Sequence, residues 1–184
     1  MHREPEVGPA SPFVLAHAER LRVAAARGPI LDLACGRGRH AIALAGGGVR
    51  VVGLDRDAGA LRELDALARA RGLAIAAVRA DAEAGCGLPF PPACFAGVVV
   101  SRFLFRPLAP ALASLLRPGG VLLYETFTHR QNELGHGPRN PAFLLDPGEL
   151  PRLFPGLAVL EYREHCTPGP RPEWLASLAA RKPS

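Results

Sequence analysis

The sequence predicts a doubly wound α/β fold in a single domain over residues 1–184, with seven strands in a mostly parallel sheet. Short apolar runs alternate with amphipathic helical stretches, and this order requires right-handed crossovers between parallel strands. The central apolar runs are continuous, as expected of strands that are covered on both faces. The last two strand-like runs are joined by the short stretch CTPGPR, which predicts an antiparallel hairpin at the C-terminus.

Local signals place each element along the chain. Ser11 followed by Pro12 matches a helix N-cap with proline in the first helical position, and Gly28-Pro29 ends that helix after residue 26. The predicted strands are residues 29–34, 49–55, 73–81, 96–102, 119–127, 157–165 and 172–182. The predicted helices after the first are residues 39–46, 58–72, 108–116 and 146–154.

Two segments stand outside this alternation. Residues 1–10 are expected to form a flexible N-terminus. Residues 128–143, THRQNELGHGPRNPAF, are polar and rich in Gly, Pro, Asn and His. A loop of this length inside a compact domain is usually functional or mobile, so we expect a polar insert or a lid. The alternative, that these side chains are only solvated, stays open.

The composition limits the possible partners. The net charge is +5, but Lys182 is the only lysine and the arginines are scattered, so nucleic acid is not the favoured partner. No run approaches the roughly 20 apolar residues that span a bilayer, and the first residues have no signal-peptide core, which predicts a cytoplasmic protein without a membrane partner. No metal is expected, because the cysteines lack zinc-ligand spacing and are expected to be free thiols. The cysteines are Cys35, Cys86, Cys94 and Cys166.

The stretch LDLACGRGRHAIALA, residues 31–45, places a glycine-spaced turn between the first strand and its helix. Ligands of open α/β sheets bind beyond the carboxyl ends of the strands, and the N–H groups of a helix start favour an anionic group. Gly36 and Gly38 let the backbone approach a ligand closely. The letters GRGRHA also satisfy G-x-G-x-x-A, with Asp55 at about the ~20-residue spacing of a ribose-binding acid, so the turn alone also allows NAD.

Three acids favour S-adenosylmethionine instead. Asp32 precedes the glycines in D-x-A-x-G-x-G, which resembles motif I of class I S-adenosylmethionine-dependent methyltransferases with Ala34 replacing the first glycine. Asp55 ends the second strand, where that family holds both ribose hydroxyls, and Asp81 stands where the family recognises the adenine amino group. Each acid alone has a simpler interpretation as a cap or a loop residue, but all three follow successive predicted strands. The resemblance implies a Rossmann-like fold, the cofactor S-adenosyl-L-methionine, and the cofactor-binding residues Asp32, Ala34, Gly36, Gly38, Arg39, Asp55, Arg56, Asp81, Ala82 and Ser101.

The resemblance to class I methyltransferases covers the chain from about residue 12 to residue 182, and it can be narrowed. The stretches SPFVLAHAERL, VVVSRFLFRPL and YETF, followed by NELGHGPRNPAFLLDPGEL, resemble a group of small bacterial methyltransferases of tellurite-resistance-like type. This resemblance implies the fold and the cofactor, and it leaves the substrate open.

Methyl transfer from a sulfonium mainly needs alignment and exclusion of water, and it needs a general base only if the nucleophile carries a proton. No catalytic residue is therefore assigned, and His129 is the best candidate because an imidazole titrates near neutrality. The stretch SRFLFRPL lacks the N/D-P-P-Y/F signature of enzymes that methylate nucleobase amino groups. The expected acceptor-side residues are Arg102, Phe103, Arg106, Tyr124, Glu125, His129, Asn132, His136 and Arg139.

The leading hypothesis is a methyltransferase that acts on a small molecule. An RNA or protein methyltransferase is the second hypothesis, which the basic balance favours but which lacks an appended recognition domain. An NAD(P)-binding oxidoreductase and a catalytically silent protein that retains the nucleoside pocket are further alternatives. The sequence leaves the acceptor atom and the oligomeric state open.

Overall fold

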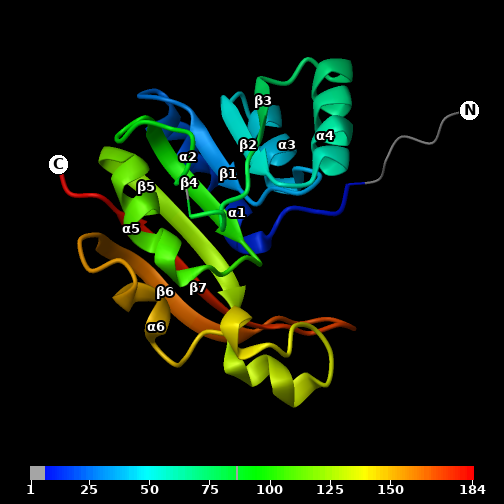
Figure 1. Cartoon of the computed structure of the whole chain (residues 1–184), viewed down its shortest axis with the longest axis vertical. Helices are drawn as coiled ribbons and strands as arrows, with labels where there is room; N and C mark the ends of the chain where they lie inside the picture. The colour runs from blue at the N-terminus through cyan, green and yellow to red at the C-terminus, as the bar shows by residue number, and fades with distance from the viewer. Residues whose placement is uncertain (1–6, 86) are drawn as a thin grey trace, which may run out of the picture.

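The computed structural model describes residues 7–85 and 87–184 as a seven-stranded sheet with helices on both faces (Figure 1). Strands β1 to β5 pair in parallel, and β7 runs antiparallel to both of its neighbours, β5 and β6. The spatial order is β3-β2-β1-β4-β5-β7-β6, which confirms the predicted doubly wound fold with a C-terminal hairpin. The strands are β1 (Ile30–Leu33), β2 (Val51–Asp55), β3 (Ile75–Arg79), β4 (Phe95–Ser101), β5 (Leu116–Phe127), β6 (Ala158–Cys166) and β7 (Trp174–Arg181).

The helices cover the two faces of the sheet and form two separate cores. Phe13, Leu21 and Leu44 pack on one face, and Leu112 and Leu150 pack on the other. The α-helices are α1 (Pro12–Ala16), α2 (Ala18–Ala25), α3 (Arg39–Gly46), α4 (Ala58–Ala70), α5 (Ala109–Leu115) and α6 (Glu149–Arg152), and the 3₁₀ turns are η1 (Arg106–Leu108), η2 (His129–Leu134) and η3 (Pro141–Phe143). Helices α1 to α3 therefore lie opposite α5 and α6, while α4 packs on β2 and β3.

The sequence predicted one continuous first helix, but this helix breaks at His17. This residue has φ −104° and ψ 6°, so α2 begins anew at Ala18. The His17 ring lies 4.7 Å from the Phe13 ring, between centroids, and its Nε2 lies 3.3 Å from the carboxylate of Glu161 in β6. These contacts come from distant parts of the chain, so a local helical pattern does not reveal the break.

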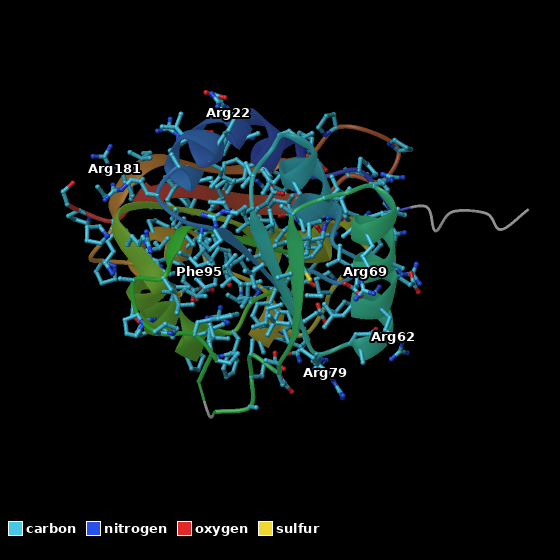
Figure 2. All side chains as sticks on the ribbon, turned by 90° about the horizontal axis from the view of Figure 1, so that it is seen from above. Arg22, Arg62, Arg69, Arg79, Phe95 and Arg181 are labelled. Carbon is cyan, nitrogen blue, oxygen red and sulfur yellow. The ribbon has the colours of Figure 1, made fainter. Side chains whose placement is uncertain are left out.

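The basic side chains are dispersed over the surface (Figure 2). The labelled arginines project outward from α2, α4, β3 and β7, whereas Phe95 is only 2% exposed in the core. Several of these arginines face acids on their own helix, such as Arg69, which lies 2.7 Å from Asp65. These side chains therefore form no continuous basic surface for a nucleic acid. Among the residues that the structure describes, no helix has the length and apolar character needed to cross a membrane.

A buried carboxylate joins the N-terminal helix to the sheet. Glu125 on β5 is 4% exposed and accepts hydrogen bonds from the hydroxyls of Ser11, at 2.6 Å, and Ser177, at 3.0 Å. The Ser11 hydroxyl also accepts the N–H of Phe13, as the predicted N-cap requires. The N-terminus that was expected to be flexible lies partly outside the described residues, and Ala10, within the described part, is buried.

Asp32 and His40 form a buried pair close to Glu125 and Ser11. His40 Nε2 accepts the backbone N–H of Ser11 at 3.2 Å, and His40 Nδ1 lies 3.9 Å from the carboxylate of Asp32. Asp32 also accepts the N–H of Ala41 at 3.0 Å. Burial raises the pKa of Asp32 to about 7 and lowers the pKa of His40 to about 3. At pH 5 to 6 the pair therefore carries a proton on the carboxyl and none on the imidazole.

We expect Ser11→Ala to lower the free energy of unfolding by about 1–3 kcal/mol. The change leaves one buried oxygen of Glu125 without a donor and removes the cap of α1. Urea denaturation measures the loss, and Ser114→Ala, at an exposed position of α5, is the control with an expected change below about 0.5 kcal/mol. A loss for Ser11→Ala as small as the control's would show that Glu125 does not depend on this donor.

The Asp32–His40 pair predicts a pH range in which its contribution to the free energy of unfolding does not change with pH. Between about pH 4 and 6.5 the unfolded pair binds one proton on His40, and the folded pair binds one on Asp32, so their joint contribution to stability is constant. In His40→Gln only the raised pKa of Asp32 remains, and its stabilising contribution is complete below about pH 4 and is lost as the pH rises through 7. The unfolding free energy of the variant should therefore fall by about 1 kcal/mol per pH unit between pH 5 and 7, relative to wild type.

Urea denaturation of His40→Gln at several pH values tests this expectation. His136→Gln is the matched control, because His136 takes no part in the buried network. A His40→Gln profile parallel to that of the wild type would show that Asp32 remains charged although it is buried.

Candidate functional site

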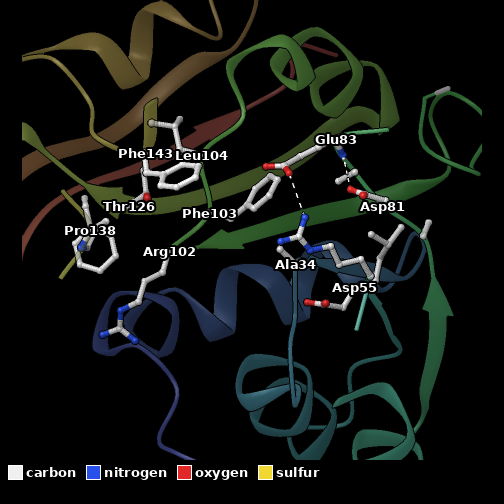
Figure 3. Close-up of a pocket in the computed structure, with 15 residues that line it drawn as sticks. Ala34, Asp55, Asp81, Glu83, Arg102, Phe103, Leu104, Thr126, Pro138 and Phe143 are labelled. Atoms are coloured by element: carbon white, nitrogen blue, oxygen red, sulfur yellow. Dashed lines mark hydrogen bonds and ion pairs between the residues drawn. The ribbon is translucent and has the colours of Figure 1, made fainter. Parts of the chain in front are cut away.

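A cavity of about 370 Å³ opens at the carboxyl ends of the parallel strands (Figure 3). It has an acidic half, formed after β1, β2 and β3 by Ala34, Leu54, Asp55, Arg56, Ala80, Asp81, Ala82 and Glu83. It also has an apolar half, formed after β4, at the end of β5 and by residues 138 and 143, which consists of Arg102, Phe103, Leu104, Thr126, Phe127, Pro138 and Phe143. Ligands of open α/β sheets bind at this edge.

The glycine-spaced turn after β1 borders the acidic half. Ala34 and Gly36 both have φ +53°, and Gly38, which precedes α3, has φ +76°. A Cβ atom at Gly38 would collide with the side chain of Leu64, so only glycine fits there. At Gly36 a Cβ atom would meet nothing within 4 Å, which leaves the face of the turn open to a ligand.

Of the three carboxylates that line the cavity, Asp55 and Asp81 are oriented by backbone donors. Asp55 accepts the N–H of Gly36 at 2.7 Å through Oδ2 and the N–H of Asp57 at 2.9 Å through Oδ1. Asp81 Oδ1 accepts the N–H of Glu83 at 2.9 Å. Each carboxylate oxygen has further lone pairs, so both residues can accept hydrogen bonds from a ligand.

An ion pair spans the acidic half. Arg56 follows β2 and Glu83 follows β3, and Arg56 Nη1 lies 3.4 Å from Glu83 Oε2, as the dashed line in Figure 3 marks. Phe103 from the loop after β4 lies close to this pair in the same view. Arg56 and Phe103 were predicted from the sequence as site residues, and Glu83 was not.

Five predicted cofactor residues do not line the cavity, namely Gly36 and Gly38 of the turn, Asp32, Arg39 and Ser101. Asp32 is 1% exposed and belongs to the buried pair with His40. Arg39 donates to Ser101 Oγ at 3.0 Å and to the carbonyl of Pro9 at 3.4 Å. No carboxylate of the described residues lies within 4 Å of the Arg39 guanidinium, and burial, followed by the charge of Arg102, lowers the pKa of Arg39.

Three predicted acceptor residues support the wall of the cavity from behind. Tyr124 is 3% exposed and donates its hydroxyl to the carbonyl of Phe103 at 3.0 Å, and burial raises the pKa of Tyr124. Arg106 lies 2.5 Å from Glu149 in α6 and donates to the carbonyl of Leu144 at 2.8 Å. Glu125 is held by the two serines described above. None of these three lines the cavity.

The polar segment 128–143 is folded around a buried glutamine. Gln131 is fully buried, accepts the N–H of Trp174 at 2.8 Å and donates to the carbonyl of His136 at 2.9 Å. His129 Nε2 lies 3.4 Å from Asp146, and Arg139 donates to the carbonyl of Gly135 at 3.0 Å. The candidate side chains His129, Asn132, His136 and Arg139 are absent from the cavity wall, to which the segment contributes Pro138 and Phe143 instead.

Several lining residues had a signal in the sequence that was not used. Glu83 stands two residues after Asp81, and Phe143 is a large apolar residue at the end of a mostly polar segment. Thr126 follows Tyr124 at the two-residue spacing of one strand face, directly before the segment begins. Reading that alternation would have placed Thr126 on the face that Tyr124 occupies.

The cysteines lie away from this chemistry. Cys35 is buried behind the turn, and burial raises the pKa of its thiol, with the charge of Asp32 adding to the effect. Cys94 and Cys166 are free, and Cys86 lies outside the described residues. Over residues 7–85 and 87–184, no cluster of three His, Cys, Asp or Glu side chains could hold a metal ion.

Comparison with solved structures finds the same fold in several proteins. TehB from Haemophilus influenzae is 18% identical with a TM-score of 0.77, over 94% of this chain and 62% of that one. A S-adenosylmethionine-dependent methyltransferase from Methanosarcina mazei is 17% identical with a TM-score of 0.71, over 96% and 99%. A protein solved in work on the conversion of a disulfide bond into a thioacetal group during echinomycin biosynthesis is 24% identical with a TM-score of 0.75, over 98% and 85%.

The sequence itself matches a family. Residues 30–120 match the family model described as "Methyltransferase domain", and no curated protein matches the chain. The matched range runs from β1 to the glycines in β5 and so contains the turn, Asp55 and Asp81. With its motif, its strand order and this match, the chain belongs to the class I methyltransferases, whose cofactor is S-adenosylmethionine.

Proposed function

We propose that this methyltransferase acts on a small-molecule acceptor. The observation that carries the proposal is the single cavity that joins the acidic half to the apolar half. Its volume of about 370 Å³ lies in the range of small-molecule sites, which is about 300–1,000 Å³. The second hypothesis, an RNA or protein acceptor, has no comparable support, because the labelled basic side chains of Figure 2 are dispersed.

The acidic half fits a nucleoside. We assign Asp55 to the two ribose hydroxyls and Asp81 to the adenine amino group, because both are acceptors that line the cavity. The open face at Gly36 gives the cofactor room beside the turn. Arg39, a half-buried cation without a carboxylate partner in the described structure, is assigned to the carboxylate of the methionine moiety, with Ser101 holding its guanidinium.

The bound cofactor supplies a methyl group on a positively charged sulfur, which is a good leaving group. The protein's own contribution is to orient the acceptor and to exclude water. Phe103, Leu104 and Phe143 form an apolar wall for this purpose. His129 is given no role in the transfer, because it pairs with Asp146 and does not line the cavity.

Two finer statements are also proposals. Membership of the tellurite-resistance-like group is supported by the stretches quoted from the sequence and by the shared fold of TehB. A cytoplasmic location is the other proposal.

We expect S-adenosylhomocysteine to raise the melting temperature by about 5–10 °C at a hundred times its Kd, because a ligand that binds only the native state stabilises it. NAD is the comparison ligand. The proposal fails if NAD shifts the melting temperature and S-adenosylhomocysteine does not. Radiolabelled S-adenosylmethionine, offered with separate pools of metabolites and RNA, then tests the class of acceptor.

Asp55→Ala should weaken S-adenosylhomocysteine binding by about 1–3 kcal/mol, because the ribose hydroxyls lose a charged acceptor. The same change also frees the N–H of Gly36, so Asp55→Asn is needed beside it, since an amide oxygen can still accept that N–H. Asp65→Ala on the outer face of α4 is the control. If calorimetry shows unchanged affinity in folded Asp55→Ala, Asp55 does not bind the ribose and only holds the turn.

Residues 135–142 should exchange their amide hydrogens faster than the strands and become protected when an acceptor binds. This part of the polar segment carries four glycine and proline positions and exposes most of its side chains, whereas Gln131 anchors the preceding turn. Hydrogen exchange with cofactor, and with cofactor plus acceptor, measures the difference. Protection equal to that of the central strands in the free protein would identify a fixed wall instead of a lid.

A further inference from the structure

The apolar half of the cavity contains a hydroxyl without a protein partner. Thr126 lies near the end of β5, is 1% exposed and lines the cavity. Across the described residues, none of the hydrogen bonds involves its hydroxyl. Its oxygen is not one of the fully buried side-chain atoms without a partner, which in the described residues are Thr128 Oγ1 and His165 Nδ1. It is therefore accessible from the cavity and can donate a hydrogen bond to a molecule that enters.

The walls around Thr126 are aromatic and partly uncovered. Phe103, Phe127 and Phe143 line this half together with Pro138. Phe143 is 46% exposed although it faces the cavity, and Figure 3 shows its ring near Leu104 and Thr126. An aromatic acceptor would bury this surface and stack or pack edge to face against these rings.

The apolar half offers no group that could remove a proton from an acceptor. The ionisable side chains that line the described cavity are Asp55, Arg56, Asp81, Glu83 and Arg102. The first four belong to the acidic half, and Arg102 is an obligate cation that is paired with Glu173. The nearby hydroxyl of Tyr124 is committed to the carbonyl of Phe103, and His129 to Asp146.

We propose, on the basis of the proposed function, that the acceptor is an aromatic thiol that binds as its thiolate, with its sulfur accepting a hydrogen bond from Thr126. The thiol loses its proton to solvent before it binds. A sulfur lone pair then forms a bond to the methyl carbon while the bond from that carbon to the cofactor sulfur breaks. The electron pair of the broken bond stays on the cofactor sulfur, so the products are a methyl thioether and S-adenosylhomocysteine.

Charge and acidity select the thiolate over other acceptors. A cysteine thiol has a pKa about 1.5 units below that of a tyrosine phenol, so its anion is roughly 30 times more abundant near pH 7. A ring on the sulfur stabilises the thiolate further, so the difference is larger for an aromatic thiol. The thiolate and the positively charged cofactor sulfur neutralise each other during the transfer, which suits an apolar site. A neutral ring nitrogen also needs no base, but it would leave a cationic product among Phe103, Phe127 and Phe143, which is unfavourable there.

The first test compares matched acceptors with the full-length protein and labelled S-adenosylmethionine. Benzenethiol, phenol and pyridine share one ring size, and reactions without protein correct for spontaneous methylation. We expect kcat/KM for benzenethiol to exceed the value for phenol by at least about tenfold. If S-adenosylhomocysteine binds but benzenethiol is not methylated, or if phenol or pyridine is preferred, the thiol inference is wrong and the proposed function stands. If S-adenosylhomocysteine does not bind, the proposed function itself fails.

The second test asks where the proton is lost. Across para-substituted benzenethiols of different acidity, the pH at which kcat/KM reaches half its maximum should follow the pKa of each free thiol, because the protein supplies no base. A midpoint that stays constant along the series would show that a group of the protein accepts the proton. This measurement uses the wild-type protein and so does not depend on the folding of any variant.

The third test concerns Thr126 as a positioning residue. Thr126→Val removes the hydroxyl at nearly constant volume and should lower kcat/KM for benzenethiol about tenfold or more, while the Kd of S-adenosylhomocysteine stays the same. Thr126→Ser keeps the hydroxyl and should retain most of the activity. Equal activity of the Val and Ser variants would show that the hydroxyl does not bind the acceptor.

Discussion

The pairing of β1 with β2 on one side and with β4 on the other is the constraint on which the site depends. Parallel strands must be joined by crossovers, and here the chain moves outward from β1 to β3 and then returns to place β4 beside β1. The loops that follow β1 and β4 therefore diverge to opposite sides and leave a crevice at their carboxyl ends. The positions of the loops that line the cavity follow from this reversal of the strand order.

The contact between Asp55 and Gly36 converts the crevice into a defined site. The carboxylate at the end of β2 holds the N–H of the turn after β1 at 2.7 Å, so two loops that are separated in sequence share one geometry. The turn itself adopts left-handed conformations at Ala34, Gly36 and Gly38. One of these is not glycine, and such a conformation is costly for other residues unless the surrounding structure enforces it. The hydrogen bonds of Asp55 contribute to that enforcement.

The fold and the acidic half were predictable from sequence because both depend on local order. Continuous apolar strands, capping residues and acids at strand ends are all read within short windows. The apolar half was less predictable because it depends on distant contacts. Tyr124 and Glu125 directly precede Thr126 on β5. The Tyr124 hydroxyl faces the carbonyl of Phe103, and Glu125 faces Ser11 and Ser177. Of the three, only Thr126 lines the cavity.

The polar segment illustrates the same limit. Its composition predicted a polar insert or a lid. Composition cannot show that Gln131 would be buried and hydrogen-bonded to the backbone of Trp174, or that Arg106 would link the carbonyl of Leu144 to Glu149 in α6. Gln131 in the segment and Leu144 just beyond it are thus held by hydrogen bonds to other parts of the chain. The part between them is held at Ala142, whose carbonyl accepts from Arg106, and it supplies Pro138 and Phe143 to the cavity. In the proposed function the acceptor meets Pro138 and Phe143 of this segment, whereas the nucleoside meets Asp55, whose carboxylate is held by two backbone N–H groups. A change of acceptor would therefore leave the nucleoside site undisturbed.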